Sequence, residues 1–318
     1  MDDTIATIEM LSADMRDEHA AIIQYLQHAY ALGESGEACE IEAIARDEMR
    51  HFDWLAEAIV ELGGKPDLDR AAVDLSGSLP AEWMARDVAA EERAISQYRD
   101  HIERIADPKI KRLLGRILSD EESHRADFTG IAAELAEEPT EGPIVLAERT
   151  AAGAHPHDVD ILQAGIEHEY SVILQYLYHD FVMPECEVGR ELEMQAINEM
   201  QHLGWLSEEL VEIGGHPRIE HTGLSLEGSS QEMLEADIEA ENAVAATYTR
   251  HIEQLENEEL KPLLTRIRDH EIYHEEVFQD LAAELHDAGA EGAEADSSPE
   301  PEGHSFTVGS LIIPETQT

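Results

Sequence analysis

A glutamate and a histidine lie three residues apart at four places in this chain, each inside a segment with the hydrophobic periodicity of an α-helix. The four pairs are Glu48–His51, Glu121–His124, Glu199–His202 and Glu271–His274. The glutamate of each pair follows another glutamate by thirty residues; these earlier residues are Glu18, Glu91, Glu169 and Glu241. Three residues are nearly one helical turn, so the members of a pair share a helix face. One pair is expected by chance, whereas four in register are not.

The same register shows that the chain is an internal duplication. Adding 151 to the numbers of Glu18, Glu48 and His51, and 150 to those of the next three residues, gives the second set. The helix end Gly63-Gly64-Lys65-Pro66 recurs as Gly214-Gly215-His216-Pro217. We therefore predict an all-α protein of two tandem four-helix bundles, each built from two helix pairs.

Helix breakers divide the chain into five parts. The expected parts are a first bundle over residues 1–137, a linker over 138–156, a second bundle over 157–287, a flexible acidic linker over 288–303 and a tail over 304–318. The polar stretch 64–80 spans roughly 50 Å when extended, more than the roughly 40 Å of a 26-residue helix. It is therefore expected to cross the whole bundle, making the second and third helices of each unit parallel.

The chain is strongly acidic, because 71 Asp and Glu residues against 21 Lys and Arg give a formal net charge of -50. This charge repels nucleic acid and anionic membranes, so we expect neither as a partner. Self-repulsion destabilises the compact state unless salt screens it, and the screening length is about 8 Å at physiological salt. We therefore predict a halophilic, salt-requiring protein; the alternative is an acidic surface that merely collects cations.

The cysteine content and the first residues of the chain argue against several classes of protein. The two cysteines, Cys39 and Cys186, form no Cys-x-x-Cys motif, which argues against a disulfide framework or a cysteine-rich metal knuckle. The first residues, Met1–Thr4, lack the basic and apolar regions of a signal peptide, and no apolar run approaches membrane-spanning length. A cytoplasmic protein is expected.

Each predicted bundle offers four glutamates and two histidines to its centre. This set suits hard or borderline divalent ions such as iron(II) and manganese(II), and two of the carboxylates can bridge a metal pair about 3.5 to 4 Å apart. Without a metal, six ionisable groups at one bundle centre would cost several kcal/mol. A solvated helix face explains a single Glu-x-x-His motif, but two complete sets favour two di-metal sites.

Two further residue types recur at helical spacing. Seven residues beyond the first glutamate of each helix pair lie the tyrosines Tyr25, Tyr98, Tyr176 and Tyr248. Two turns place them on the metal-facing side, where they either hydrogen-bond or donate electrons to the site, or serve as core tyrosines. Ten residues beyond the same glutamates lie His28, His101, His179 and His251. For these histidines we favour polar packing over metal transfer.

The run Arg46-Asp47-Glu48-Met49-Arg50-His51, followed by Gly-Gly-Lys-Pro, closely resembles bacterioferritin and its ferritin-like relatives. Residues 18–25 and Asp120–His124 strengthen the resemblance, which covers about 4–137 and 157–287. It implies a ferroxidase that binds two iron(II) ions, reduces dioxygen or peroxide and releases iron(III) for storage. The matching catalytic and metal-binding residues are Glu18, Glu48, His51, Glu91, Glu121 and His124, then Glu169, Glu199, His202, Glu241, Glu271 and His274.

Bacterioferritins also bind haem across a two-fold interface through a methionine between the ligands of the second helix. Met49 and Met200 occupy that place, and two bundles in one chain can recreate such an interface. A methionine beside a ligand usually serves packing, so the sequence argues against haem.

The end of the chain carries a second resemblance. A polar Gly-, Ser- and Pro-containing linker leads to a short apolar segment, made of Phe306, Thr307, Val308, Gly309, Ser310, Leu311 and Ile312. This segment resembles the carboxy-terminal targeting peptide of encapsulin cargo proteins. Alternating apolar side chains around a glycine fit an extended peptide that docks in shell pockets. The resemblance implies an encapsulin shell as partner and an encapsulin nanocompartment as location; residues 314–318 depart from the pattern.

Together these features predict an iron(II) oxidase and iron-storage cargo protein, with homo-oligomerisation left open. The enzymatic alternative is a peroxide-scavenging rubrerythrin or a manganese catalase, which use the same bundle. Rubrerythrins usually carry a glutamate one turn after the third-helix ligand, where this chain has Ala94 and Val244, and a cysteine-rich module that this sequence lacks. The non-enzymatic alternative is a cargo protein whose metals are structural.

Overall fold

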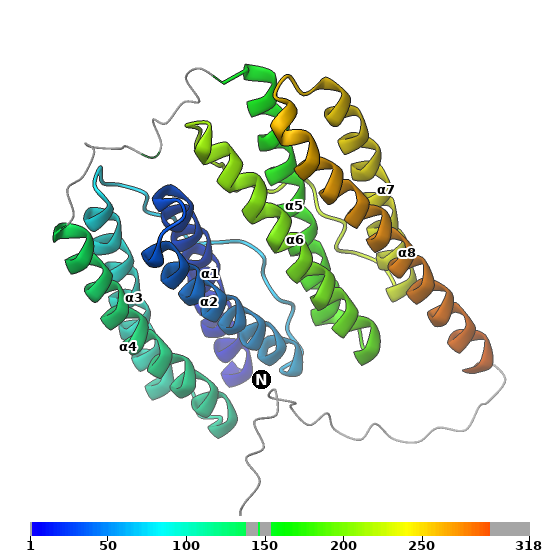
Figure 1. Ribbon diagram of the computed structural model, residues 1–318. Coiled ribbons are helices and arrows are strands. Elements are labelled where there is room, and N and C mark those ends of the chain that lie inside the picture. The colour runs from blue at the N-terminus through cyan, green and yellow to red at the C-terminus, as the bar shows by residue number, and fades with distance from the viewer. Residues whose placement is uncertain (1, 138–145, 147–153, 293–318) are drawn as a thin grey trace, which may run out of the picture.

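The computed structural model describes residues 2–137, 146 and 154–292. In this part of the chain the secondary-structure elements are all helices, without a β-strand (Figure 1). The elements are α1 (Asp2–Leu32), α2 (Gly36–Glu61), α3 (Pro80–Arg104), α4 (Pro108–Glu137), α5 (Pro156–Val182), α6 (Cys186–Glu212), α7 (Ser230–Gln254), the 3₁₀ turn η2 (Glu258–Leu260) and α8 (Lys261–Gly292). None of the described helices is both long and apolar enough to cross a membrane. The all-α prediction is confirmed.

Local sequence signals set the helix ends. Ser35 caps α2 by accepting a hydrogen bond from Ala38 N at 3.0 Å. At the other end Gly63 adopts a φ of 80°, and Gly64 N donates to Ile59 O at 2.9 Å. A Cβ on Gly64 would lie 2.9 Å from the Ile59 side chain, so the turn needs a glycine there. The repeat of this glycine pair ends α6 in the same way.

The start of α8 differs from that of its counterpart α4. The second unit begins this region with the 3₁₀ turn Glu258–Leu260 before the helix proper starts at Lys261. Pro262 lies at the second position of α8, where its missing N–H and fixed φ are tolerated. At its other end α8 continues to Gly292, past the boundary at 287 that we expected.

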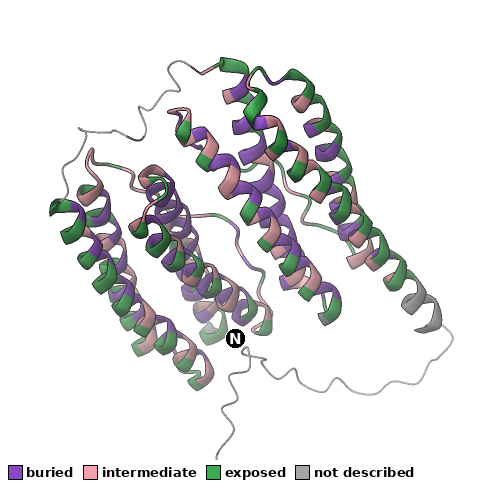
Figure 2. Ribbon diagram, in the orientation of Figure 1, coloured by how far each residue is buried: buried purple, intermediate pink, exposed green. Residues whose placement is uncertain are grey.

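Each bundle consists of two tightly packed helix pairs, α1 with α2 and α3 with α4 in the first, α5 with α6 and α7 with α8 in the second. The buried residues of each bundle face inward between these pairs (Figure 2). The crossover between α2 and α3 runs beside α1, since Ala71 N donates to Arg16 O at 3.0 Å and Asp74 N donates to Gln24 Oε1 at 2.8 Å. The long crossover expected from its length is confirmed, and Gln175 holds the second one through Ser225.

The two bundles lie side by side, and helices α1 and α2 of the first contact helices α5 and α6 of the second (Figure 1). Helix α1 packs against α6, and α2 packs against α5. Because α5 and α6 are the repeats of α1 and α2, these two contacts are related by pseudo-two-fold symmetry. His19 Nε2 lies 2.5 Å from Tyr170 Oη at this interface. Arg70 of the first crossover donates to Ile219 O at 2.8 Å and pairs with Glu220 at 2.5 Å. The duplicated halves therefore form one pseudo-symmetric body.

Candidate metal centre

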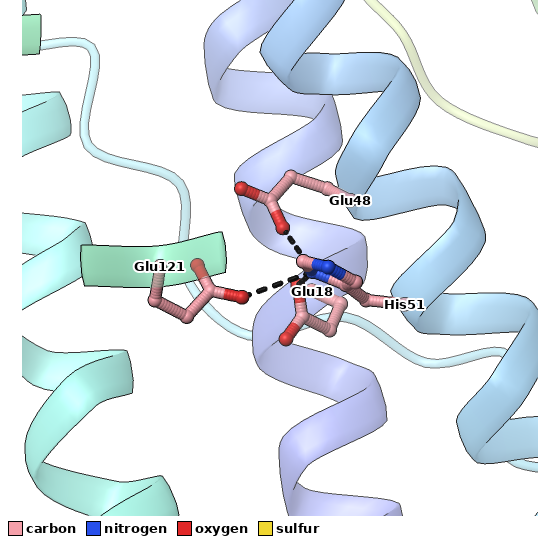
Figure 3. A group of neighbouring side chains, drawn as sticks. All are labelled: Glu18, Glu48, His51 and Glu121. Atoms are coloured by element: carbon pink, nitrogen blue, oxygen red, sulfur yellow. Dashed lines mark hydrogen bonds and ion pairs between the residues drawn. The ribbon is translucent and has the colours of Figure 1, made fainter. Parts of the chain in front are cut away.

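The six predicted residues of the first bundle converge on its axis, and we call this group centre 1. Its members are Glu18 of α1, Glu48 and His51 of α2, Glu91 of α3, and Glu121 and His124 of α4. All six are buried. In Figure 3, Glu18, Glu48 and Glu121 surround the ring of His51. His51 Nδ1 lies 2.8 Å from Glu48 Oε2 and 2.9 Å from Glu121 Oε1.

Centre 1 contains two overlapping groups of side chains that share two carboxylates. One group is Glu18, Glu48, His51 and Glu121; the other is Glu48, Glu91, Glu121 and His124. Within each group the donor atoms lie within 4.8 Å of one another. Glu48 and Glu121 belong to both groups, and His124 Nδ1 lies 3.0 Å from Glu48 Oε1. This is the geometry in which two carboxylates bridge a pair of ions and one glutamate and one histidine complete each position.

The second bundle repeats the arrangement, and we call this group centre 2. Its members are Glu169, Glu199, His202, Glu241, Glu271 and His274, all buried. Glu199 and Glu271 are the shared carboxylates. His202 Nδ1 lies 2.7 Å from Glu199 Oε2 and 3.0 Å from Glu271 Oε1. The structure therefore brings together every one of the twelve residues that the sequence singled out.

Burial and crowding control protonation in centre 1. Burial, with the charges of Glu121 and Glu48, raises the pKa of Glu18 well above its usual value. Burial also opposes ionisation of Glu48, but hydrogen bonds to His124 and His51 outweigh it and hold its pKa below its usual range. Burial alone would lower the pKa of His124, yet hydrogen bonds to Glu121 and Glu48 raise it to about 10. The metal-free cluster therefore holds protons that a bound cation would displace.

The chemistry of the donor set fits a pair of divalent cations. Glu91 Oε2 and Glu241 Oε2 are buried and accept no hydrogen bond, which is costly for a carboxylate unless a cation contacts it. Oxygen and imidazole donors of this kind suit iron(II) and manganese(II). The glutamates come from all four helices and the histidines from two, so ions bound here would also tie each bundle together.

Residues 8–137 and 159–288 each match the ferritin-like domain family. This chain belongs to that family. A bacterioferritin of Desulfovibrio desulfuricans is 31% identical over 134 residues, which cover 40% of this chain and 75% of that protein. A bacterioferritin of Rhodobacter capsulatus is 33% identical over 129 residues, covering 38% and 78%. Among solved structures, that of the D. desulfuricans bacterioferritin with its di-iron site in different catalytic states has 28% identity and a TM-score of 0.41, covering 42% of this chain and 82% of that one.

In this ferritin-like chain the tyrosines donate hydrogen bonds to the glutamates that are not shared. Tyr25 of α1 donates through Oη to Glu91 Oε1 of α3 at 2.6 Å. Tyr98 of α3 donates in the reverse direction to Glu18 of α1. The corresponding donor and acceptor pairs of the second bundle are Tyr176–Glu241 and Tyr248–Glu169. The tyrosines are therefore buried core residues that also hydrogen-bond to the glutamates of each centre that are not shared. Electron donation by these tyrosines stays a prediction.

Sequence reasoning missed the aspartates that face the outlying histidines. His28 Nδ1 lies 2.9 Å from Asp87 Oδ2, and Gln24 Nε2 donates to Asp87 Oδ1 at 2.8 Å. The second bundle repeats this with His179, Asp237 and Gln175. Asp87 lies one helical turn before Glu91, so its place on the inner face was a readable signal. His28 and His179 thus have the polar packing role that we favoured.

Met49 and Met200 line one cavity of about 510 Å³ between the two bundles of this ferritin-like protein. Both side chains also pack partly buried against the hydrophobic core. Apolar side chains of α1 and α5 provide much of the remaining wall. The packing role that the sequence favoured is thus observed for both methionines, and haem binding stays untested; a Soret band in the purified protein would reveal it. The predicted targeting segment 306–312 lies outside the described residues.

Proposed function

We propose that each bundle oxidises iron(II) at its buried centre, which makes this chain a ferroxidase with one di-iron site per bundle. The observation that carries the proposal is that four carboxylates and two imidazoles converge twice, each time with two carboxylates common to both metal positions. Membership of the ferritin-like family and the similarity to bacterioferritins support it.

Iron(II) is the substrate in this reaction. Two ions each give up one electron, and dioxygen takes the pair with two protons to become hydrogen peroxide. If peroxide is the oxidant, it takes the pair with two protons to become two water molecules. Glu48 and Glu121 hold the ions close together, while the remaining glutamate and histidine of each group hold one ion apiece. Iron(III) then leaves for storage as a mineral.

The side chains around the ions keep the glutamates in position. Tyr25 and Tyr98 each donate one hydrogen bond to a glutamate that serves a single metal position. Each tyrosine occupies one carboxylate oxygen of its glutamate, so the other oxygen is available to bind a metal ion. Glu91 Oε2 is such an oxygen, since it accepts no hydrogen bond. The buried setting excludes bulk water and strengthens the attraction between carboxylates and cations.

Stopped-flow absorbance after mixing iron(II) with aerobic protein tests the proposal. We expect the unmodified chain to oxidise iron(II) rapidly. In the double variant Glu48→Gln, Glu199→Gln the fast phase should slow by about 10²-fold or more, because each centre then lacks one of its two shared carboxylates. Glu40→Gln, at an exposed position of α2, is the matched control and should oxidise iron normally. A double variant that reacts as fast as the control would contradict the proposal.

We propose further that the protein works as cargo of an encapsulin shell, inside a cytoplasmic nanocompartment that stores the iron. The support is the resemblance of residues 306–312 to cargo targeting peptides and their place after a polar linker. Deleting residues 304–318 should abolish co-purification with a co-expressed shell protein and leave metal binding intact. Deleting residues 293–297, which shortens the linker only, is the control and should preserve co-purification. Retention of the shell protein by the tail deletion would contradict cargo targeting.

Manganese catalase or rubrerythrin-like peroxide removal remains the alternative, because the same ligands suit manganese(II). Neither bundle has a carboxylate where rubrerythrins carry an extra glutamate; Ala94 and Val244 occupy these places and pack against the core. Anaerobic metal titration with elemental analysis, followed by peroxide turnover measurements on iron- and manganese-loaded protein, separates the activities. Tight stoichiometric metal without turnover of either kind would identify a structural role.

A further inference from the structure

The two centres contain the same set of four glutamates and two histidines but differ in the side chains near the Nε2 atoms of their histidines, which lie away from the glutamates. In centre 1, His51 Nε2 lies 3.5 Å from Asp120 Oδ2, and His124 Nε2 lies 3.4 Å from Asp47 Oδ2. Each histidine therefore turns Nδ1 toward the glutamates and Nε2–H toward a carboxylate. A carboxylate in this place makes the imidazole a stronger ligand, and its loss typically costs about 10- to 100-fold in metal affinity.

Centre 2 has no carboxylate at either corresponding position. His270 stands in place of Asp120, and its Nδ1 lies 2.9 Å from His202 Nε2. Asn198 stands in place of Asp47 and donates through Nδ2 to Gln195 Oε1 at 3.0 Å. His202 thus has an imidazole as its outer partner, and the residue that replaces Asp47 is an amide bound to Gln195, so neither position supplies the negative charge of a carboxylate.

Arginines near the two aspartates weaken this contrast without removing it. Arg50 pairs with Asp47, and Arg116 Nε lies 3.1 Å from Asp120 Oδ2. Their side chains are 57% and 64% exposed, whereas Asp120 is 21% exposed, so solvent screens the guanidinium groups more than this carboxylate. In the second bundle the counterpart Arg266 lies instead over the ring of Trp205, 4.2 Å from its centroid.

A pocket lies beside centre 2, and its lining includes a residue that differs from its counterpart in the first bundle. It has a volume of about 300 Å³ and is lined by Gly165, Thr247 and Tyr248 among others. Tyr248 donates to Glu169, so the pocket adjoins the centre itself. At the position of Gly165 the first bundle carries Asp14, which is buried.

Asp14 is buried and paired at the corresponding position of the first bundle. It accepts a hydrogen bond from Gln97 Nε2 at 2.9 Å and lies 2.9 Å from His101 Nδ1. A Cβ on Gly165 would meet Leu206 Cδ1 at 2.8 Å and Tyr248 Oη at 3.0 Å, so the second bundle needs glycine there. Asp14 is only 1% exposed, so little solvent reaches this position.

We propose that the two centres are unequal: centre 1 retains its metal, and centre 2, with weaker histidine ligands and an adjoining pocket, exchanges it. The proposal rests on the proposed function only in requiring that both centres bind a divalent cation. It assigns Asp47, Asp120 and His270 as positioning residues that set metal affinity through the histidines they contact. At the fourth position Asn198, bound to Gln195, leaves His274 without the carboxylate that Asp47 supplies to His124.

Anaerobic titration with cobalt(II), followed by its visible absorption, measures the difference without any oxidation chemistry. Centre 1 is isolated in the variant Glu199→Gln, Glu271→Gln, and centre 2 in the variant Glu48→Gln, Glu121→Gln. We expect the cobalt(II) Kd of isolated centre 1 to be at least about tenfold lower than that of isolated centre 2. Equal values would overturn the proposal and leave the proposed function standing. No binding at either centre would overturn both.

Reciprocal exchange of the outer residues identifies the cause. Asp47→Asn with Asp120→His should raise the Kd of isolated centre 1 about tenfold, and Asn198→Asp with His270→Asp should lower that of isolated centre 2. Circular dichroism confirms that each variant is folded, and the opposite directions of the two shifts exclude general destabilisation. Exchanges that leave both Kd values unchanged would overturn the assignment of these residues.

Chelator extraction tests the contribution of the pocket. EDTA should remove cobalt(II) from isolated centre 2 faster than from isolated centre 1. Thr247→Gln, which introduces the residue of the first bundle, should slow extraction from centre 2 with little change in Kd. Thr247→Ser is the matched control and should leave the rate unchanged. An extraction rate that Thr247→Gln does not alter would exclude the pocket as the exchange route.

Discussion

At the scale of single residues, the tyrosine–glutamate pairs join the two helix pairs of each bundle. Tyr25 donates from α1 to Glu91 on α3, and Tyr98 donates from α3 to Glu18 on α1. Each hydroxyl donates a hydrogen bond to a glutamate that is buried among other carboxylates. The tyrosines therefore fill the hydrophobic core and also hold the glutamates of the centre in position.

Replacing Tyr25 by Phe should destabilise the metal-free protein by about 1 to 3 kcal/mol, because Glu91 Oε1 then lacks its donor inside the core. Denaturant unfolding of the metal-free chain measures this loss. Tyr273→Phe removes a hydroxyl from a tyrosine that is 59% exposed and serves as the control. Equal unfolding midpoints for the two variants would contradict a structural role for the Tyr25 hydrogen bond.

The sequence identified the clustered glutamates and histidines better than their surroundings. Glu48 and His51 share a helix face whatever the helix packs against, so spacing alone identified them. Which carboxylates are shared, and that Tyr25 reaches Glu91 and not Glu18, depends on the position of one helix relative to another. Asp47 and Asp120 were overlooked as partners of the histidines for the same reason, since contacts between helices have no fixed sequence spacing.

At the scale of elements, the glycine-ended helices and long crossovers were predictable because local turn chemistry and chain length determine them. The contact between the bundles was not, since it depends on surface shape. At that contact α5 brings Asp180 near Glu193 of α6 and Glu57 of α2, and Asp53 of α2 also faces Asp180. Burial and the charges of Glu193 and Glu57 raise the pKa of Asp180 from 3.8 to about 7.

The folded state holds the proton of Asp180 more tightly than the unfolded chain does. This contribution to stability is complete at a pH below the unfolded pKa of 3.8, and it is lost as the pH rises from there through about 7. We therefore expect the melting temperature to fall between pH 5 and pH 8. Asp180→Asn should flatten this dependence by removing about 2 kcal/mol of pH-sensitive stability. Thermal melts of both proteins across this range measure it, with Asp280→Asn at an exposed position of α8 as control. Parallel curves for Asp180→Asn and the unmodified chain would contradict the assignment.

At the scale of the whole molecule, the net charge of -50 is the dominant feature. Seventy-one carboxylates on a chain of this length repel one another, and salt shortens the range of that repulsion. We predict that the melting temperature rises strongly between dilute buffer and molar potassium chloride. Sucrose, which stabilises proteins without screening charge, provides the comparison. Equal stability in dilute buffer and molar salt would contradict a halophilic protein.

The pairing of His19 with Tyr170 has a consequence for how such a chain diverges. These two residues occupy the same place in their respective halves, since their numbers differ by 151. In a dimer of identical subunits, a residue on the symmetry axis meets its own copy, so every substitution there must be tolerated twice. Covalent linkage of the halves removes that requirement of self-complementarity. Each half is then free to accumulate changes that its neighbour need not share, while the histidine–tyrosine contact favours joining unlike halves over joining like ones.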